Sequence, residues 1–158
     1  MKNAPLMTQY DGREPVPKWD SRIARRGALD TLHAEVWLIY SQAYKNESIT
    51  ERTSILARIG GIICDCRQSD TKNENRICPE DIFWLNEMTE RYAALAADPV
   101  SMYKLDLTAS QINLLRTHIR QAELLYCYNG VDGLDAEIQA VLNDLSAAAY
   151  VAVRTENT

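Results

Sequence analysis

The sequence predicts an all-α protein, a compact bundle of about five helices that follows an extended N-terminal arm. Apolar residues recur every three or four positions in several long segments, which is the spacing of helices that each bury one face. Residues that favour helix starts, such as Asp20 and Pro79, stand just before these segments. Only residues 102–107 alternate in the manner of a strand, so we expect at most one short strand.

The first 18 residues are rich in proline, with Pro5, Pro15 and Pro17. Proline fixes φ and biases the residue before it toward an extended conformation. We therefore expect residues 1–18 to form an extended arm without regular structure, which docks on its own domain or on a neighbouring subunit. Residues 19–154 are numerous enough to bury a core and are expected to form a single helical domain.

Two helices are expected in the first half of this domain. Asp20 can cap a helix that begins at Ser21, and residues 45–47 end it. Ser48 and Glu51 have the spacing of a capping box, which predicts the start of the second helix. That helix contains two consecutive glycines, each about 1 kcal/mol less favourable than alanine, which indicates close helix packing or a kink.

A polar stretch divides the two halves of the domain. Residues 67–78 show no helical periodicity, so we expect them to form a connector. Pro79 suits the first position of the next helix, because a proline there lacks only an amide that would have no partner. Asp98 and Pro99 end this helix.

Two more helices are expected after the extended segment at residues 102–107. Thr108 to Gln111 reads as a second capping box and opens the most regular helix of the sequence. Asn129-Gly130 ends that helix, since both residues tolerate the left-handed conformation that follows a helix. Asp132 or Asp135 then caps the last helix.

The charge distribution indicates which partners the protein could bind, and the apolar pattern indicates where in the cell it is located. The net charge is −5, although residues 1–26 carry six basic side chains against three acidic ones. The rest of the chain is therefore strongly acidic, which makes nucleic acid an unlikely partner because phosphate binding needs clustered cations. The sequence has no apolar run near the length of a membrane span and no signal peptide, so we expect a cytoplasmic protein with reduced thiols.

Three of the four cysteines are candidate zinc ligands. Cys64, Cys66 and Cys78 would need a fourth ligand, for which His33 or Cys127 are available. The C-x-C spacing departs from the C-x-x-C of zinc knuckles, and no second pair is present. We favour small, partly buried thiols and expect no metal and no cofactor.

A pair of carboxylates offers a second alternative. Glu87 and Glu90 lie three residues apart and would share one helical face, as in all-helical magnesium-dependent nucleotide hydrolases. A magnesium site would need a matching pair on a facing helix, and the spacing around Glu123 does not supply one. A solvated helix face is the simpler explanation.

The function favoured by the sequence is that of a non-enzymatic protein-interaction module. The sequence lacks a Gly-rich phosphate loop, a G-x-S-x-G motif and an H-E-x-x-H motif. We expect an acidic helical accessory protein, of the kind that phages and mobile elements encode, which binds a host or partner protein or forms a homo-oligomer. The expected contact residues lie in the arm, at the basic start of the first helix and on the acidic C-terminal helices: Trp19, Arg22, Arg25, Arg26, Asp132, Asp135, Glu137 and Asp144.

Overall fold

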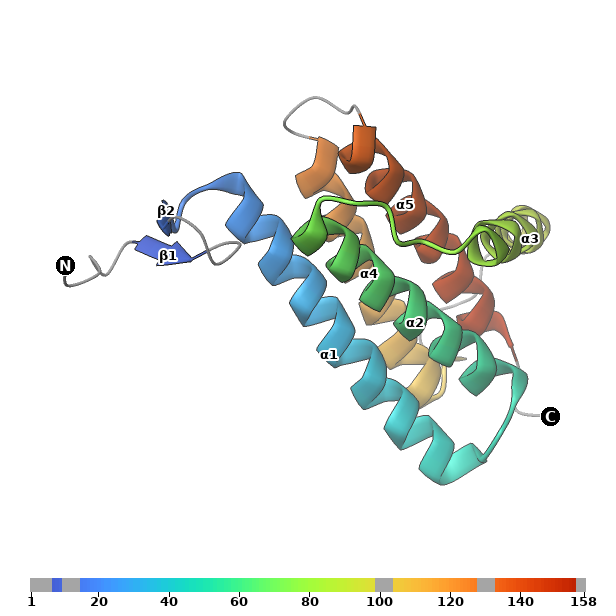
Figure 1. Ribbon diagram of the computed structural model, residues 1–158. Coiled ribbons are helices and arrows are strands. Elements are labelled where there is room, and N and C mark those ends of the chain that lie inside the picture. Colours follow the sequence, from blue (N-terminus) through green and yellow to red (C-terminus); the bar gives the residue numbers. More distant parts are fainter. Residues whose placement is uncertain (1–6, 10–14, 99–103, 128–132, 156–158) are drawn as a thin grey trace.

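Five helices and one two-stranded hairpin make up the described part of the chain, which comprises residues 7–9, 15–98, 104–127 and 133–155 of a computed structural model. Helices α1, α2, α4 and α5 pack side by side, and α3 lies at the edge of the bundle next to α5 (Figure 1). This arrangement confirms the predicted all-α bundle of about five helices. The elements are β1 Met7–Gln9, β2 Pro15–Pro17, α1 Ser21–Glu47, α2 Glu51–Lys72, α3 Pro79–Ala96, α4 Leu107–Cys127 and α5 Gly133–Arg154.

The hairpin occupies part of the arm that was predicted to lack regular structure. β1 pairs antiparallel with β2, with Met7 opposite Pro17 and Gln9 opposite Pro15. Both prolines already hold φ near extended values, and an edge strand tolerates their missing N–H groups. The hairpin lies beyond the N-terminal end of α1 (Figure 1). Residues 7–9 and 15–17 are extended, whereas their pairing was not predicted.

The start of α1 agrees with the sequence, whereas the start of α2 does not. The Asp20 carboxylate accepts the backbone N–H of Arg22 at 2.9 Å, as expected for the cap of α1. Ser48, predicted as the cap of α2, instead adopts a φ of 61° and donates its N–H to Tyr44, which ends α1. Thr50 caps α2 reciprocally with Thr53, through bonds of 2.8 and 3.2 Å.

The polar stretch predicted as a connector from residue 67 is helical as far as Lys72. Ser69 and Asp70 are buried, and the Ser69 hydroxyl accepts the backbone N–H of Arg76 at 2.9 Å. Tertiary contacts therefore extend the helix through a sequence with weak apolar periodicity. The non-helical connection is limited to residues 73–78.

Helices α1 and α2 approach each other closely at Gly60. A Cβ atom at this position would lie 2.8 Å from Cζ2 of Trp37, nearer than real side chains approach. The indole is fixed, because its Nε1–H donates to His33 Nε2 at 3.1 Å and its ring meets Tyr40 edge to face. The two consecutive glycines were predicted to mark either close helix packing or a kink. Gly60 marks close packing.

Helix α3 begins with Pro79 at its first turn, as predicted, and packs mainly against α5. Its link to α2 is polar: Arg58 donates to Asp81 at 2.9 Å and lies over the Trp84 ring. Only Leu85 and Met88 of this helix are fully buried. Helix α3 is thus the least embedded of the five.

Helices α4 and α5 form the most extensive contact of the bundle. Asp106 caps α4 by accepting the N–H of Ala109 at 2.6 Å, so the capping box predicted at residues 108–111 is wrong. The strand predicted at residues 102–107 is absent from the described residues 104–107, and residues 102–103 lie outside the described ranges. Asp135 lies within the first turn of α5 rather than capping it.

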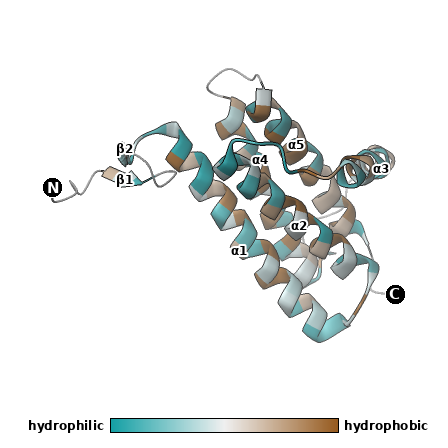
Figure 2. Ribbon diagram, viewed as in Figure 1, coloured by the Kyte–Doolittle hydropathy of each residue, from teal (hydrophilic) through white to brown (hydrophobic). Residues whose placement is uncertain are grey.

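Half of α5 is buried, and much of its length is hydrophobic in Figure 2. By contrast, the first turns of α1 are mainly hydrophilic in the same view. None of the helices in the described ranges has both the length and the apolar content that crossing a membrane requires.

Arg52 joins the ends of three other helices from the interior of the bundle. Its guanidinium, only 3% exposed, donates to Asp106 at 3.0 Å and to the backbone oxygens of Ala152 and Thr155. It also lies 3.6 Å from Glu47 at the end of α1. A buried charge with this many acceptors is stable, because its lost hydration is replaced.

Candidate functional site

The arginines of the described ranges fall into two groups. Nine of them lie within 4.0 Å of a carboxylate and form ion pairs within the chain. Among the described residues, Arg116 and Arg120 form no such pair. They stand one turn apart on α4, where like charges at this spacing weaken a helix by a few tenths of a kcal/mol. The bundle therefore carries two adjacent cations that its own carboxylates do not neutralise.

Both arginines line one pocket, which we call the α4–α5 pocket. It has a volume of about 340 Å³ and is open to solvent. Helix α3 contributes an aromatic and a hydroxyl side chain to one wall, and α5 contributes an amide, a carboxylate and a serine. The lining residues are Thr89, Tyr92, Arg116, Arg120, Glu123, Leu124, Asn143, Asp144, Ser146 and Ala147.

The guanidinium of Arg116 is held from two sides. Its Nε donates to Asn113 Oδ1 at 3.1 Å, and its central carbon lies 5.9 Å from the ring centre of Tyr150. The Tyr150 ring is in turn met edge to face by Tyr92 at 5.3 Å. Within the described part of the chain the terminal nitrogens of Arg116 have no hydrogen-bond acceptor, so they are available to an anion.

The pocket also contains two carboxylates. Glu123 accepts a bond from Gln139 at 2.8 Å, which fixes it on the α5 side. Burial raises the pKa of Asp144 above its usual value, and the charge of Glu123 raises it further, although a bond from Asn143 opposes both. The acidic side chains thus have other partners than the arginines.

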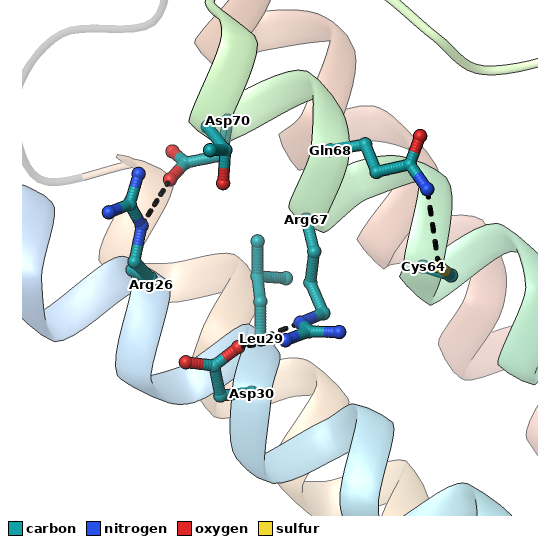
Figure 3. A pocket seen from close by; sticks show the side chains of 8 residues that line it. Arg26, Leu29, Asp30, Cys64, Arg67, Gln68 and Asp70 are labelled. Atoms are coloured by element: carbon teal, nitrogen blue, oxygen red, sulfur yellow. Dashed lines mark hydrogen bonds and ion pairs between the residues drawn. The ribbon is translucent and has the colours of Figure 1, made fainter. Parts of the chain in front are cut away.

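A second pocket, between α1 and α2, is already neutralised by its own side chains (Figure 3). Arg67 bonds to Asp30 at 2.7 Å, Arg26 lies 3.8 Å from Asp70, and Gln68 donates to the Cys64 sulfur at 3.6 Å. The pocket measures about 310 Å³. Because its charges pair across the two helices, it offers a ligand less uncompensated charge than the α4–α5 pocket does.

The basic start of α1 is likewise engaged within the protein. Arg25 is buried, forms an ion pair with Asp135 and lies 5.0 Å from the ring centre of Tyr126. Arg22 pairs with the capping Asp20 at 2.8 Å. Arg25 and Asp135, both predicted to contact a partner, contact each other in the structure, and their role in binding a partner stays a prediction.

Comparison with known proteins identifies the family. The sequence model described as cobalamin adenosyltransferase matches residues 6–156, nearly the whole chain. The chain belongs to the cobalamin adenosyltransferase family. A search of curated proteins gave no match.

Solved structures with the same fold include PduO-type ATP:corrinoid adenosyltransferases from Lactobacillus reuteri. A phenylalanine-to-histidine variant of that enzyme, complexed with cobalamin and ATP, is 21% identical with a TM-score of 0.67, over 94% of this chain and 84% of the other. A phenylalanine-to-alanine variant with the same ligands is 20% identical, also with a TM-score of 0.67, over 94% and 87%. An arginine-to-lysine variant complexed with ATP gives the same values as the second.

Membership of the cobalamin adenosyltransferase family overturns the function expected from the sequence. The prediction of a non-enzymatic accessory protein of phage or mobile-element type is wrong, because the family is one of enzymes. The prediction rested on the absence of known catalytic motifs from the sequence, and that absence does not exclude an enzyme.

The remaining predicted contact residues are spread over the fold. Trp19 follows the hairpin and is 72% exposed, and Glu137 is exposed on α5. Asp144 lines the α4–α5 pocket, whereas Arg26 lines the pocket between α1 and α2. Asp132 lies outside the described residues. The structure does not bring these residues together, and their role in binding a partner stays a prediction.

The candidate metal ligands lie in different environments. Cys66 is buried in the core, Cys64 is half-buried, and Cys78 is exposed before α3. Burial raises the pKa of the Cys66 thiol, and the hydrogen bond with Glu80 raises the pKa of the Cys78 thiol. Across the described ranges, no group of three or more His, Cys, Asp or Glu side chains could hold a metal.

Glu87 and Glu90, the alternative hydrolase pair, are both exposed on α3. Neither lines the α4–α5 pocket. The residues that sequence reasoning missed are Arg116 and Arg120. Their signal was present in the sequence: two like charges at i, i+4 have a small structural cost that a ligand could explain.

Proposed function

We propose that this protein transfers the adenosyl group of ATP to the cobalt of a corrinoid. The observation that carries the proposal is a pocket with two arginines that lack carboxylate partners among the described residues, in a chain of the cobalamin adenosyltransferase family. The named ligands of the structurally similar enzymes, cobalamin and ATP, support the same substrate pair.

The chemistry of this transfer creates a large negative charge on the leaving group. A bond forms between cobalt and the 5′ carbon of ATP, with the electron pair supplied by the reduced cobalt. The bond between that carbon and the triphosphate oxygen breaks, and triphosphate leaves with the electron pair of the broken bond. The protein must therefore stabilise a polyanion.

The α4–α5 pocket has the features that this task requires. Two guanidinium groups on successive turns of α4 can contact neighbouring phosphates, since arginine donates two parallel bonds to a phosphate. Asn143 and Ser146 add neutral polar groups on the opposite wall. We expect the triphosphate to bind in the pocket and the corrinoid to bind to the adjoining surface.

The test is an anaerobic assay with ATP and chemically reduced cobalamin, followed by the absorbance change of the corrinoid and by release of triphosphate. We expect turnover by the wild-type protein. Arg116→Ala and Arg120→Ala should each lower kcat/KM by about 10²-fold, which is typical for removal of one group that stabilises a developing anion.

Arg91→Ala is the matched control, because Arg91 is an arginine on α3 that pairs with Glu51 outside the pocket. It should leave kcat/KM unchanged. Absence of adenosylated product with the wild-type protein would overturn the proposal. Wild-type turnover in both pocket variants would overturn the assignment of the pocket.

Self-association, expected from the sequence, is part of the proposal. Leu38 on α1 and Leu114 on α4 are 59% and 53% exposed. Gln42 and Gln111 bond across the same two helices at 3.0 Å, and each lies one turn from one of these leucines. A second copy of the chain would cover this apolar face. The cytoplasmic location and the absence of a nucleic-acid partner stay predictions.

A further inference from the structure

We propose that Asn113 and Tyr150 are positioning residues that hold the Arg116 guanidinium ready for the triphosphate. The inference rests on the proposed function of the α4–α5 pocket and identifies how that pocket is kept in a binding geometry. Neither residue lines the pocket itself. Both act through Arg116.

Asn113 fixes one edge of the guanidinium. It lies three residues before Arg116 on α4, so the two side chains share one helix face. Its Oδ1 accepts the Nε–H at 3.1 Å. This bond uses the Nε–H and leaves the N–H groups of both terminal nitrogens without an acceptor among the described residues.

Tyr150 fixes the plane of the guanidinium from the opposite helix. It is 8% exposed on α5, and its ring centre lies 5.9 Å from the central carbon of Arg116, within the range of a cation–π contact. The ring is itself held, because Tyr92 meets it edge to face and Arg154 donates to its hydroxyl at 3.4 Å. The Tyr150 ring is therefore held in place by side chains of both α3 and α5.

The contacts with Asn113 and Tyr150 together explain how Arg116 is ordered without a carboxylate partner among the described residues. A solvated arginine samples many rotamers, and ordering it on binding would lower affinity. Arg116 is ordered beforehand by a neutral acceptor and a neutral ring, so its full positive charge remains for the ligand. A carboxylate partner would order it equally well but would neutralise that charge.

The experiment measures ATP and inorganic triphosphate affinity by calorimetry, without corrinoid. Asn113→Ala and Tyr150→Leu should each weaken binding by roughly 3- to 30-fold, the range of a lost charge-assisted bond or cation–π contact. Tyr150→Phe retains the ring and should bind within about twofold of wild type. In turnover, the weakened variants should show a raised KM for ATP with a smaller change in kcat.

An Arg116→Ala background separates positioning from general structure. If Asn113 and Tyr150 act through Arg116, their variants should cause no further loss of affinity there. Trp84→Leu is the matched control, since it removes the aromatic ring that faces Arg58, outside the pocket. It should leave ATP affinity unchanged.

The outcomes distinguish the two proposals. If the wild-type protein binds neither ATP nor triphosphate, the proposed function fails. If it binds both, but Asn113→Ala and Tyr150→Leu bind equally well, or lose as much affinity without Arg116 as with it, the positioning role is overturned. Asn113→Ala replaces a partly exposed helical side chain with the best helix former, so it carries the test even if Tyr150→Leu does not fold.

Discussion

A single hydrogen bond makes His33 sensitive to pH. Its Nε2 accepts the indole N–H of Trp37, which requires the neutral imidazole. Burial lowers the pKa of His33, and the charge of Arg67 on α2 lowers it further, while Asp30 on α1 opposes both. A protonated ring would lose the bond and face Arg67 with a like charge.

The lowered pKa of His33 determines how the free energy of unfolding changes with pH. The pKa of His33 is lower in the folded protein than in the unfolded chain, so the unfolded state binds more protons as pH falls below about 6.5. We expect the free energy of unfolding to fall between pH 7.5 and pH 5 by up to the worth of one hydrogen bond, about 1 kcal/mol.

Urea unfolding of the wild type and of His33→Gln measures this contribution. Glutamine can accept the indole N–H but does not titrate, so the variant should show a smaller loss of stability at pH 5. Equal losses in both proteins would show that His33 does not contribute. The difference between the two proteins removes the effect of all other titrating groups.

Individual residues were predictable from the sequence where their role depends on near neighbours. Asp20 and Pro79 fall at helix starts because each acts on the backbone within one turn. The proposed role of Arg116 depends on its having no ion pair with a carboxylate among the described residues. Its surroundings include side chains on α3 and α5, which the sequence order does not place.

At the scale of helix pairs, the consecutive glycines of α2 provide a matched comparison. Gly60→Ala would force a Cβ to within 2.8 Å of the fixed Trp37 ring, whereas Gly61→Ala would place one in open space. Both changes gain about 1 kcal/mol of helix propensity, but overpacking at the α1–α2 contact costs about 1–3 kcal/mol.

We therefore expect the two substitutions to have opposite effects on the free energy of unfolding. Gly61→Ala should raise the free energy of unfolding by about 0.5–1 kcal/mol, and Gly60→Ala should lower it by about 1 kcal/mol, both measured by chemical denaturation. Stabilisation by both substitutions would contradict the close α1–α2 packing.

Near the helix boundaries, several residues compete to cap the helix. The serine and threonine predicted to cap α2 and α4 each stand two residues from the actual caps, Thr50 and Asp106. Several residues near each start could satisfy the first amides, and the choice depends on tertiary partners. Asp106 also binds Arg52, which favours it over its neighbours. Helix number and order depend on longer periodicity and were predicted correctly.

For the whole molecule, self-association can be tested at the exposed α1–α4 face. Leu114→Arg introduces a charge where the proposed contact buries a leucine worth about 1.5–3 kcal/mol. Sedimentation should show an assembled wild type, and the variant should need at least a tenfold higher concentration to assemble.

Ile49→Arg is the control, since Ile49 is 78% exposed in the turn between α1 and α2, outside this face. It should assemble as the wild type does. A monomeric wild type at high concentration, or an unaffected Leu114→Arg protein, would contradict the proposed contact.

The sequence predicted the architecture of the molecule better than its chemistry. Periodic apolar residues such as Ile112, Leu115 and Ile119 determine which helix face is buried, and all three lie in the core. The candidate site requires α3, α4 and α5 to meet around Arg120. That meeting depends on packing between distant segments, which periodicity alone does not specify.

The buried guanidinium of Arg52 has a consequence for how the chain folds. Its partners are Asp106 and the end of α5, which accept hydrogen bonds, and Glu47, which forms an ion pair; they are separated by up to about a hundred positions in the sequence. Until all of these ends are in place, desolvating the charge is unfavourable. The interior around Arg52 should therefore close late and cooperatively, so that fraying at the C-terminus weakens the start of α4 as well.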